Sequence, residues 1–428
     1  MKRSMKVRIY PNEAQKRRID SILRGCNFVW NQFIGYNECN TKYCDAYAYM
    51  KKFTVLKQTN EKFKWLQGVY NPALQHAIID CHRAFRSYFN NDEKNRPNYK
   101  SRKRGNGFTS YFFPINYGFH LKQNEPSMRN TIVLPALGTI RCPRKDKLPE
   151  ESLISSGRII RTKDEKYFVF VIYDIKSDED FGSYSPGIGI DLGILKYATV
   201  VDENGNIIPN DDLIPEGTFL NDPKYIKLEN EICRIQRILN KKVEVNYNRM
   251  VRDYMDANNG NYPSQKELYQ MRSDAHFSCR IEKLYKRLRK LYLKRTNYGT
   301  DKICKLVNNL TKTKPNYIAI EDLNVHEMIT SDAFIQGNHT LHDHISKSKW
   351  YEFKMRLIAK CEERNIELRL IDQRYPSTRI CSNCKTINNK IAMSNRLFIC
   401  EDCGNVMDRD LNAAINICNT SRYKVYCA

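Results

Sequence analysis

The alternation of apolar and polar residues divides the N-terminal part of the chain into a strand followed by helices. The run MKVRIYP alternates apolar with basic residues and predicts a strand that ends at Pro11. Asn12 and Gln15 then form a pair typical of a capping box, and apolar residues recur at helical spacing over residues 13–36. Similar spacing continues to Phe89. The chain therefore opens with one strand and a helical block.

After this block, apolar residues recur at every second position. The runs FTSYFFP, NTIVLPALGTIRC and SGRIIRTKDEKYFVFVIYDI predict strands, with a hairpin turn at 163–166. Together with the first strand they predict a small antiparallel β-barrel into which the helical block is inserted. A basic loop, NRPNYKSRKRGNG at 95–107, separates the helices from these strands. It is either a solvated linker or a contact to phosphates.

A polar linker, SDEDFGSYSPG, ends at Gly187 and precedes a second unit. In the next run, GIGIDLG, Ile188 and Ile190 fall on one face of a strand, whereas Gly189 and Asp191 fall on the other. Asp191 thus projects from a face without large side chains. We expect that bare face to admit a phosphate backbone close to the carboxylate.

Residues 222–313 show two helical stripes with a turn at 256–265. The stripes consist of Leu228, Ile232, Ile235 and Leu239, and of Ile281, Leu284, Leu288 and Leu291. From Arg280 to Arg295 the second helix carries eight Lys or Arg residues and a single acid, Glu282. Such a face is either simply solvated or lined by nucleic acid, and its one-sided charge favours nucleic acid.

A short buried strand, YIAIE, follows Pro315 and places Glu321 on the same face as Ala319. Residues 326–344 lack a clear period, and we expect a loop. Its histidines, His339, His342 and His344, are expected to be solvated, with a metal site as the alternative. A helix from about Ser346, facing inward with Trp350, Phe353, Leu357 and Cys361, and a strand at 366–372 then lead to the C-terminal segment.

Two Cys-x-x-Cys pairs give this C-terminal segment its most specific pattern. Fifteen residues separate the first pair, Cys381 and Cys384, from the second, Cys400 and Cys403. This spacing is typical of a site in which four thiolates bind one tetrahedral Zn²⁺. Four sulfurs complete the coordination shell, so we predict a structural ion without a position for substrate.

An Ala-rich helix, DRDLNAAINI, follows the second cysteine pair. Asp410 shares its buried stripe with Ala413, Ala414 and Ile417, whereas Asp408 better suits the N-cap. A role for Asp408 in metal binding stays open, and Asn412 is a further candidate for an assisting role.

Asp191, Glu321 and Asp410 thus each accompany an apolar element, an arrangement that resembles the ribonuclease H fold. Three converging carboxylates can hold two Mg²⁺ ions, about 4 Å apart, for phosphodiester hydrolysis.

The net charge narrows the choice of partner. The chain has 71 Lys and Arg against 48 Asp and Glu, a net charge of +23, together with 27 Tyr and 18 Phe. This composition indicates nucleic acid as the partner, with an anionic membrane surface as the alternative. We find no apolar run long enough to span a membrane and no signal peptide. The remaining cysteines are scattered, which favours reduced thiols and a cytoplasmic protein.

These motifs resemble those of the TnpB family, the transposon-encoded RNA-guided endonucleases. The runs GIGIDLG, YIAIEDLN and RYPSTRICSNC…FICEDCG…DRDLNAAINI resemble the three RuvC-type nuclease motifs and the interposed zinc ribbon. KVRIYPNEAQ, FVWNQFIGYN, LQHAIIDCHRAF and NYKSRKRG resemble the N-terminal pattern of the family. Lys385 departs from it, because the family usually has Gly after the first cysteine pair.

The resemblance implies an α/β fold with all-β and helical parts. It assigns a β-barrel wedge domain to 1–11 and 95–185, and a helical recognition domain to 12–94. An RNase H-like (RuvC) nuclease domain would span 186–375 and 405–428, with the zinc ribbon inserted at 376–404.

By matching positions Asp191, Glu321 and Asp410 become the catalytic, Mg²⁺-binding residues, and a single Zn²⁺ is structural. The expected partners are one guide RNA per protein and double-stranded target DNA with a short flanking motif. Three alternatives stay open: a compact type V CRISPR effector, an RNA-guided DNA-binding regulator that does not cut, and a guide-independent resolvase or transposase.

Overall fold

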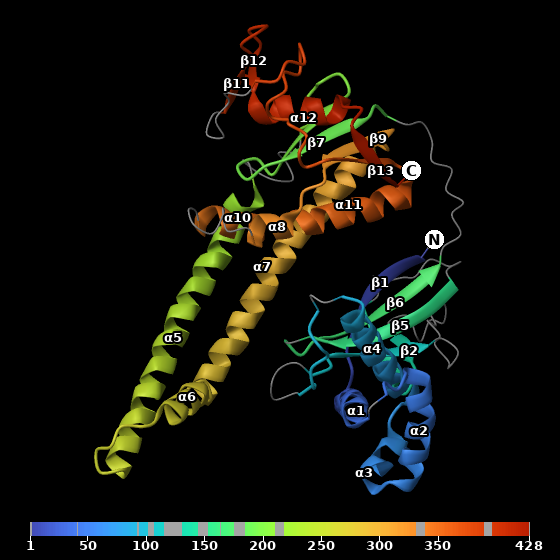
Figure 1. The fold of residues 1–428 in the computed structure, drawn as a ribbon, viewed down its shortest axis with the longest axis vertical. Helices are drawn as coiled ribbons and strands as arrows, with labels where there is room; N and C mark the ends of the chain where they lie inside the picture. The colour runs from blue at the N-terminus through green and yellow to red at the C-terminus, as the bar shows by residue number, and fades with distance from the viewer. Residues whose placement is uncertain are drawn as a thin grey trace. The chain divides into compact units, whose positions relative to one another are not determined.

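The computed structural model describes residues 2–40, 42–91, 94–101, 107–114, 131–143, 153–162, 164–174, 185–209, 218–330, 339–388 and 396–427. The chain divides into two compact units, Met1–Asp178 and Glu179–Ala428 (Figure 1). Most of the polar linker predicted before Gly187 lies outside the described residues, as does part of the basic loop at 95–107. In the part of the chain that the structure describes, no helix combines the length and the apolar composition needed to cross a membrane.

The first unit contains an antiparallel sheet, as predicted. Its strands are β1 (Lys2–Ile9), β2 (Ser110–Pro114), β5 (Leu153–Arg161) and β6 (Tyr167–Asp174), in the order β1-β6-β5-β2. A separate hairpin comprises β3 (Thr131–Leu134) and β4 (Gly138–Arg141). The amide of Tyr10, just after β1, donates to the carbonyl of Arg141 at 2.9 Å and so links the hairpin to the sheet. Over the described residues the sheet is open, and the closed barrel stays a prediction.

The helices of the first unit are α1 (Glu13–Cys39), α2 (Ala46–Thr59), α3 (Glu61–Lys64), η1 (Trp65–Gly68) and α4 (Asn71–Phe89). The predicted capping box is present at the start of α1, where Asn12 and Gln15 exchange side-chain to backbone hydrogen bonds. The buried helix residues share one apolar core with the inner face of the sheet. The described part of the basic loop packs on α1, because the indole of Trp30 donates to the carbonyl of Asn98 at 3.0 Å.

The second unit is built around a mixed five-stranded sheet. Its strands are β7 (Ile188–Leu192), β8 (Ala198–Asp202), β9 (Tyr317–Glu321), β10 (Glu367–Ile371) and β13 (Tyr423–Cys427). In the order β13-β10-β9-β7-β8, the three central strands are parallel and each outer strand is antiparallel to its neighbour. Parallel strands need long crossover connections, and the helical segments of this unit provide them.

Different helices cover the two faces of this sheet. One face packs against α7 (Cys279–Lys312) and α11 (Trp350–Arg364) in a large core that includes Ile188, Ile190, Ile318 and Ile320. On the other face Ala319 lies in a smaller core with Ala414 and Ile417 of α12 (Arg409–Asn419). The predicted alternation of β7 and β9 is therefore confirmed.

Two long helices, α5 (Pro223–Ala257) and α7, run side by side and are joined through α6 (Gln265–Asp274) (Figure 1). The two predicted stripes pack against each other in one cluster, with Ile232, Ile235 and Leu239 meeting Ile281, Leu288 and Leu291. The predicted turn at 256–265 is confirmed, although the sequence did not indicate α6. A short helix, η4 (Phe219–Asn221), precedes α5.

The expectation of a loop at 326–344 is wrong for the residues that the structure describes there. The described residues there are helical, in α8 (Val325–Thr330) and α10 (His339–Ser348), while 331–338 lie outside the description. Ile345 is buried and anchors α10, and Lys347 pairs with Asp343 one turn earlier at 2.7 Å. A helix with so few apolar contacts leaves only a weak period in the sequence.

Candidate metal centres

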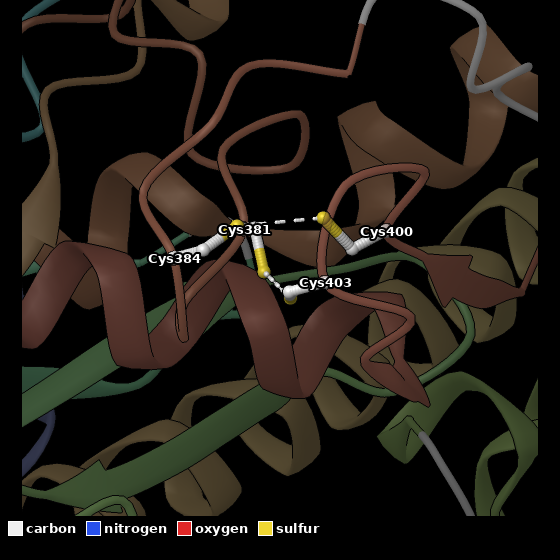
Figure 2. A group of neighbouring side chains, drawn as sticks. All are labelled: Cys381, Cys384, Cys400 and Cys403. Carbon is white, nitrogen blue, oxygen red and sulfur yellow. Dashed lines mark hydrogen bonds between the residues drawn. The ribbon is translucent and has the colours of Figure 1, made fainter.

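Four cysteines converge where two loops meet in the C-terminal part of the chain. Cys381, Cys384, Cys400 and Cys403 each offer a sulfur, and all four sulfurs lie within 4.8 Å of one another. Figure 2 shows the four side chains directed toward one another, and the dashed lines mark the Cys381–Cys403 and Cys384–Cys400 sulfur pairs, at 3.6 and 3.5 Å. The cluster predicted from the spacing is confirmed, and its four soft donors fit Zn²⁺.

The two cysteine loops have the same backbone geometry. In the first, the amide of Lys385 donates to the carbonyl of Cys381 at 2.9 Å; in the second, the amide of Gly404 donates to that of Cys400 at 3.1 Å. Both residues have a φ of +68°. Glycine adopts this left-handed conformation at little cost, whereas a residue with a Cβ is strained there by about 1 kcal/mol. Lys385 therefore keeps the loop geometry at some cost in stability.

Hydrogen bonds prepare a sulfur of the cluster for a cation. Amide groups of Cys403 and Asp402 lower the pKa of the Cys400 thiol to about 6. The side-chain amide of Asn388 donates to the same sulfur at 3.7 Å. Donors that stabilise a thiolate favour the form of cysteine that binds metal. The strands β11 (Leu397–Ile399) and β12 (Val406–Asp408) form a hairpin that flanks the second cysteine loop, and Phe398 packs against the buried cysteines.

Two acids lie at the same level of the central sheet in the second unit. Asp191 is the second-last residue of β7, and Glu321 is the last residue of β9. The two strands are parallel, and Ile190 pairs with Ile320 just before the acids. Strand alternation then directs both carboxylates to the face that α12 covers, as the sequence predicted.

The glycine face of β7 does not have the predicted role. A Cβ on Gly189 would lie 2.5 Å from the Cβ of Cys418 and 2.6 Å from the carbonyl oxygen of Ala414, both in α12. A Cβ on Gly187 would meet the ring of Tyr317 at 2.3 Å. The interpretation that these glycines admit a phosphate backbone is therefore wrong for both positions, because protein atoms already fill the space.

Helix α12 carries the third acid in its first turn. Asp408 is the N-cap, since its carboxylate accepts from the amides of Asp410 and Leu411 at 3.0 and 3.1 Å. Asp410 is buried, and the guanidinium of Arg396 donates to it at 3.2 Å. The guanidinium of Arg409 lies 3.5 Å from its other oxygen. The predicted division between a capping Asp408 and an inward Asp410 agrees with this geometry.

The three acids influence one another electrostatically. Burial raises the pKa of Asp191 well above its usual value, and the nearby charges of Glu321 and Asp410 raise it further. Burial also raises the pKa of Glu321, against a hydrogen bond from the Ser377 hydroxyl. Repulsion between like charges in a buried site is what a bound cation relieves, so hard oxygen donors here fit Mg²⁺.

Among the described residues, the four cysteines are the one group of three or more His, Cys, Asp or Glu side chains whose ligand atoms are close enough to share one metal ion. The sequence prediction named each member of both sets, and the catalytic role of the three acids stays a prediction.

Sequence reasoning missed several polar residues around the acids. Ser377 donates to Glu321 at 2.5 Å, and Arg396 contacts Asp410. Asn412, named as a candidate for an assisting role, instead bonds the backbone at the start of the cysteine segment, donating to the carbonyl of Ile380 at 2.7 Å. Such contacts join residues far apart in sequence and leave no periodic signal. The short spacing from Ser377 to Cys381 is the one sequence hint that both belong to one loop.

The chain resembles known families and proteins over most of its length. Residues 350–417 match a family described as the Cas12f1-like TNB domain, and residues 1–42 match one described as a helix-turn-helix domain. A candidate RNA-guided DNA endonuclease of Streptomyces pristinaespiralis is 24% identical over 425 residues, which cover 97% of this chain and 89% of that protein. The TnpB-like protein L770 of Acanthamoeba polyphaga mimivirus is also 24% identical, covering 97% of this chain and 72% of that protein.

A solved structure resembles the whole chain. It is a cryo-EM structure of a Cas12f1 protein in complex with sgRNA and target DNA. The identity is 13%, the TM-score is 0.53, and the match covers 99% of both chains. At this identity the likeness indicates a shared fold of mixed helices and sheets.

Proposed function

The chain belongs to the TnpB family, and from this premise we propose that it is an RNA-guided DNA endonuclease that hydrolyses phosphodiester bonds of target DNA. One observation carries the proposal: Asp191 and Glu321 lie near the ends of adjacent parallel strands, and Asp410 lies in the first turn of the helix that covers them. Relatives that match nearly the full chain are named as nucleases of this kind.

Asp191, Glu321 and Asp410 would hold the catalytic Mg²⁺ ions. When bound, two such ions activate water and stabilise the leaving oxygen of the phosphodiester. The protein supplies rigid support for the ligands, because Asp191 and Glu321 lie on strands and Asp410 lies in the capped first turn of α12.

The four cysteines would hold one structural Zn²⁺. The ribbon around them has a very small apolar core, in which Phe398 and Met407 pack against Cys381 and Cys400. Such a core is too small to fold alone, so the ion would supply much of its stability. No open coordination position remains once four thiolates are bound, and the ribbon therefore has a supporting role.

The domains follow the family pattern in this proposal. Residues 1–11 and 95–185 form the β-barrel wedge domain, and 12–94 form the helical recognition domain. Residues 186–375 and 405–428 form the RNase H-like nuclease domain, with the zinc ribbon at 376–404. Guide RNA would select the target by base pairing, while the protein reads a short flanking motif in the DNA duplex.

The basic face of α7 is a further surface suited to nucleic acid. Of its eight Lys and Arg residues from Arg280 to Arg295, all except Arg295 are exposed. Arg287 and Arg295 form ion pairs with acids of α5. Even with these two pairs, the segment carries more positive than negative charge. This charge complements the phosphate backbone of RNA or DNA.

The test compares cleavage by the wild-type chain with cleavage by Asp191→Ala and Glu321→Gln, each purified with its RNA. Both variants should bind target DNA but lose cleavage by at least 1,000-fold, on the order of a lost essential group. Asp322→Asn is the matched control, since this neighbour of Glu321 is half exposed and pairs with Lys354. Its cleavage should equal that of the wild-type chain.

Cleavage by Asp191→Ala at the wild-type rate would remove the assignment of the three acids. Guided binding without Mg²⁺-dependent cutting by the wild-type chain would favour a binding-only regulator. Cutting by protein that carries no RNA would favour a guide-independent resolvase or transposase. Sequencing the co-purified RNA completes the test, because a uniform species with a constant portion is expected, and its origin separates a transposon guide from a CRISPR guide.

A further inference from the structure

The loop between β10 and the first cysteine pair passes directly beside Glu321. Ser377 lies in this loop and is buried, with 3% of its surface exposed. Its hydroxyl donates to the Oε1 atom of Glu321 at 2.5 Å. Four residues later the same loop reaches Cys381, which belongs to the cysteine cluster. One short segment therefore contacts both candidate metal centres.

Helix α12 holds this loop through two buried asparagines. The side-chain amide of Asn416 donates to the carbonyls of Ser377 and Ile380 at 2.9 and 2.7 Å. Asn412, one turn earlier, donates to the same Ile380 carbonyl at 2.7 Å and accepts from the amide of Ser382 at 2.9 Å. The exposed fractions of Asn416 and Asn412 are 2% and 0%. The helix that carries Asp410 thus also fixes the loop that contacts Glu321.

We propose that Ser377 is a positioning residue for the Glu321 carboxylate, and that Asn412 and Asn416 fix its loop to α12. The segment 377–382, which leads into the zinc ribbon, and the nuclease centre would then both be held by α12. This inference rests on the proposed function, in which Glu321 binds Mg²⁺. It adds a role for residues that do not touch metal or substrate.

The physical reason is the rotational freedom of a glutamate side chain. A carboxylate at the end of a strand can turn about several bonds, and each orientation that points away from the ion lowers metal affinity. A hydrogen bond to Oε1 fixes one oxygen and leaves the other, with further lone pairs, to face the ion. Residues that orient metal ligands in this way change metal affinity by about 10- to 100-fold when they are removed.

Binding of Mn²⁺, followed by electron paramagnetic resonance, tests the proposal on the full chain with its zinc and RNA. The nuclease-centre signal is the part of the binding that Asp191→Ala lacks. Ser377→Ala should weaken this binding by about 10-fold. The Mg²⁺ concentration for half-maximal cleavage should rise by a similar factor, whereas the rate at saturating Mg²⁺ should change much less. Ser377→Thr keeps the hydroxyl and should restore most of the affinity.

Thr378→Ala is the matched control, because it removes a hydroxyl from the next residue of the same loop. Its Mn²⁺ affinity should equal that of the wild-type chain. Asn416→Ala should act in the same direction as Ser377→Ala, and the zinc content of Ser377→Ala should stay at the wild-type value, which excludes general unfolding of the ribbon.

Wild-type Mn²⁺ affinity in Ser377→Ala would overturn the proposal while leaving the proposed function intact. An equal loss in Thr378→Ala would also overturn it, since that result would indicate a general disturbance of the loop. A wild-type chain without Asp191-dependent Mn²⁺ binding would instead remove the proposed function, and this inference with it.

Discussion

Gly189 of β7 packs tightly against α12, so Gly189→Ala tests the packing on which the candidate nuclease centre depends. The added Cβ would lie 2.5 Å from the Cβ of Cys418 and 2.6 Å from the carbonyl oxygen of Ala414. Ordinary van der Waals contact begins at 3.4 Å. Because the Ala414 atom belongs to the backbone, no rotation of a side chain can remove the overlap, and α12 itself must move.

The required movement of α12 is nearly 1 Å, the shortfall from ordinary contact. Overpacking costs about 1–3 kcal/mol, and a rigid backbone neighbour places this substitution near 3 kcal/mol. For a unit of this size that loss lowers the unfolding temperature by about 6–12 °C. Asp410 moves with the helix, and a displacement of about 1 Å at a reacting centre can lower the rate by about 100-fold.

The assay is thermal unfolding of the full chain together with the rate of guided cleavage. Gly35→Ala serves as the control, because Gly35 lies inside α1 with its nearest neighbour, the Tyr99 hydroxyl, at an ordinary 3.5 Å. This control should be at least as stable as the wild-type chain, since alanine favours a helix by about 1 kcal/mol. A Gly189→Ala chain that unfolds within 2 °C of wild type, on the scale of about 1 kcal/mol, and cuts at the wild-type rate would refute the packing of α12 on β7.

Three further substitutions have defined outcomes. Lys385→Gly removes the strain of a left-handed residue and should slow the loss of zinc to a chelator by about fivefold. Gly404→Ala adds the same strain and should speed the loss of zinc. An unchanged rate in both variants would contradict the shared loop geometry. Cys400→Ser should abolish zinc binding and expose the ribbon to proteolysis while leaving far-ultraviolet circular dichroism nearly unchanged, and a protease-resistant ribbon would count against a structural ion. Asp191→Asn should raise the unfolding temperature without Mg²⁺ at neutral pH. Because the folded pKa of Asp191 is raised, the stability it contributes is full below its unfolded pKa near 4 and is lost as pH rises through the folded pKa. The advantage of Asn should therefore shrink toward pH 4, and a constant difference would contradict the shift.

The spacing of apolar residues along the sequence made the main helices and strands of the second unit predictable. The apolar stripes of α5 and α7 lie where the sequence predicted them, because apolar residues at every third or fourth position are a local property of sequence. Alternation likewise placed Asp191 and Glu321 on one face of the sheet, since the side-chain period of a strand is fixed by its backbone. The cysteine cluster was equally predictable, because the spacing of ligands follows from tetrahedral coordination.

Contacts that depend on tertiary packing were not predictable. A glycine in a strand indicates that something comes close, but not whether it is a helix or a ligand, and at Gly189 it is α12. The bond from Ser377 to Glu321 joins residues whose positions are set by two different elements. The helix α10 was missed because Ile345 is its one buried apolar residue among the residues whose burial is described.

Helix α12 connects these observations, because this one short element contributes an acid of the candidate nuclease centre and also packs against the strands that carry the other two. Its N-cap is Asp408, its first turn presents Asp410, and its buried stripe covers the face of the sheet from which Asp191 and Glu321 project. Two further side chains of α12, Asn412 and Asn416, donate to backbone carbonyls of the segment 377–382, which leads into the cysteine cluster. A displacement of the segment 377–382 is therefore expected to shift two of the acids: Asp410, because α12 moves with the segment, and Glu321, because Ser377 is bonded to it. Loss of zinc is thus expected to weaken Mg²⁺ binding, although the four cysteines contribute no ligand to that site.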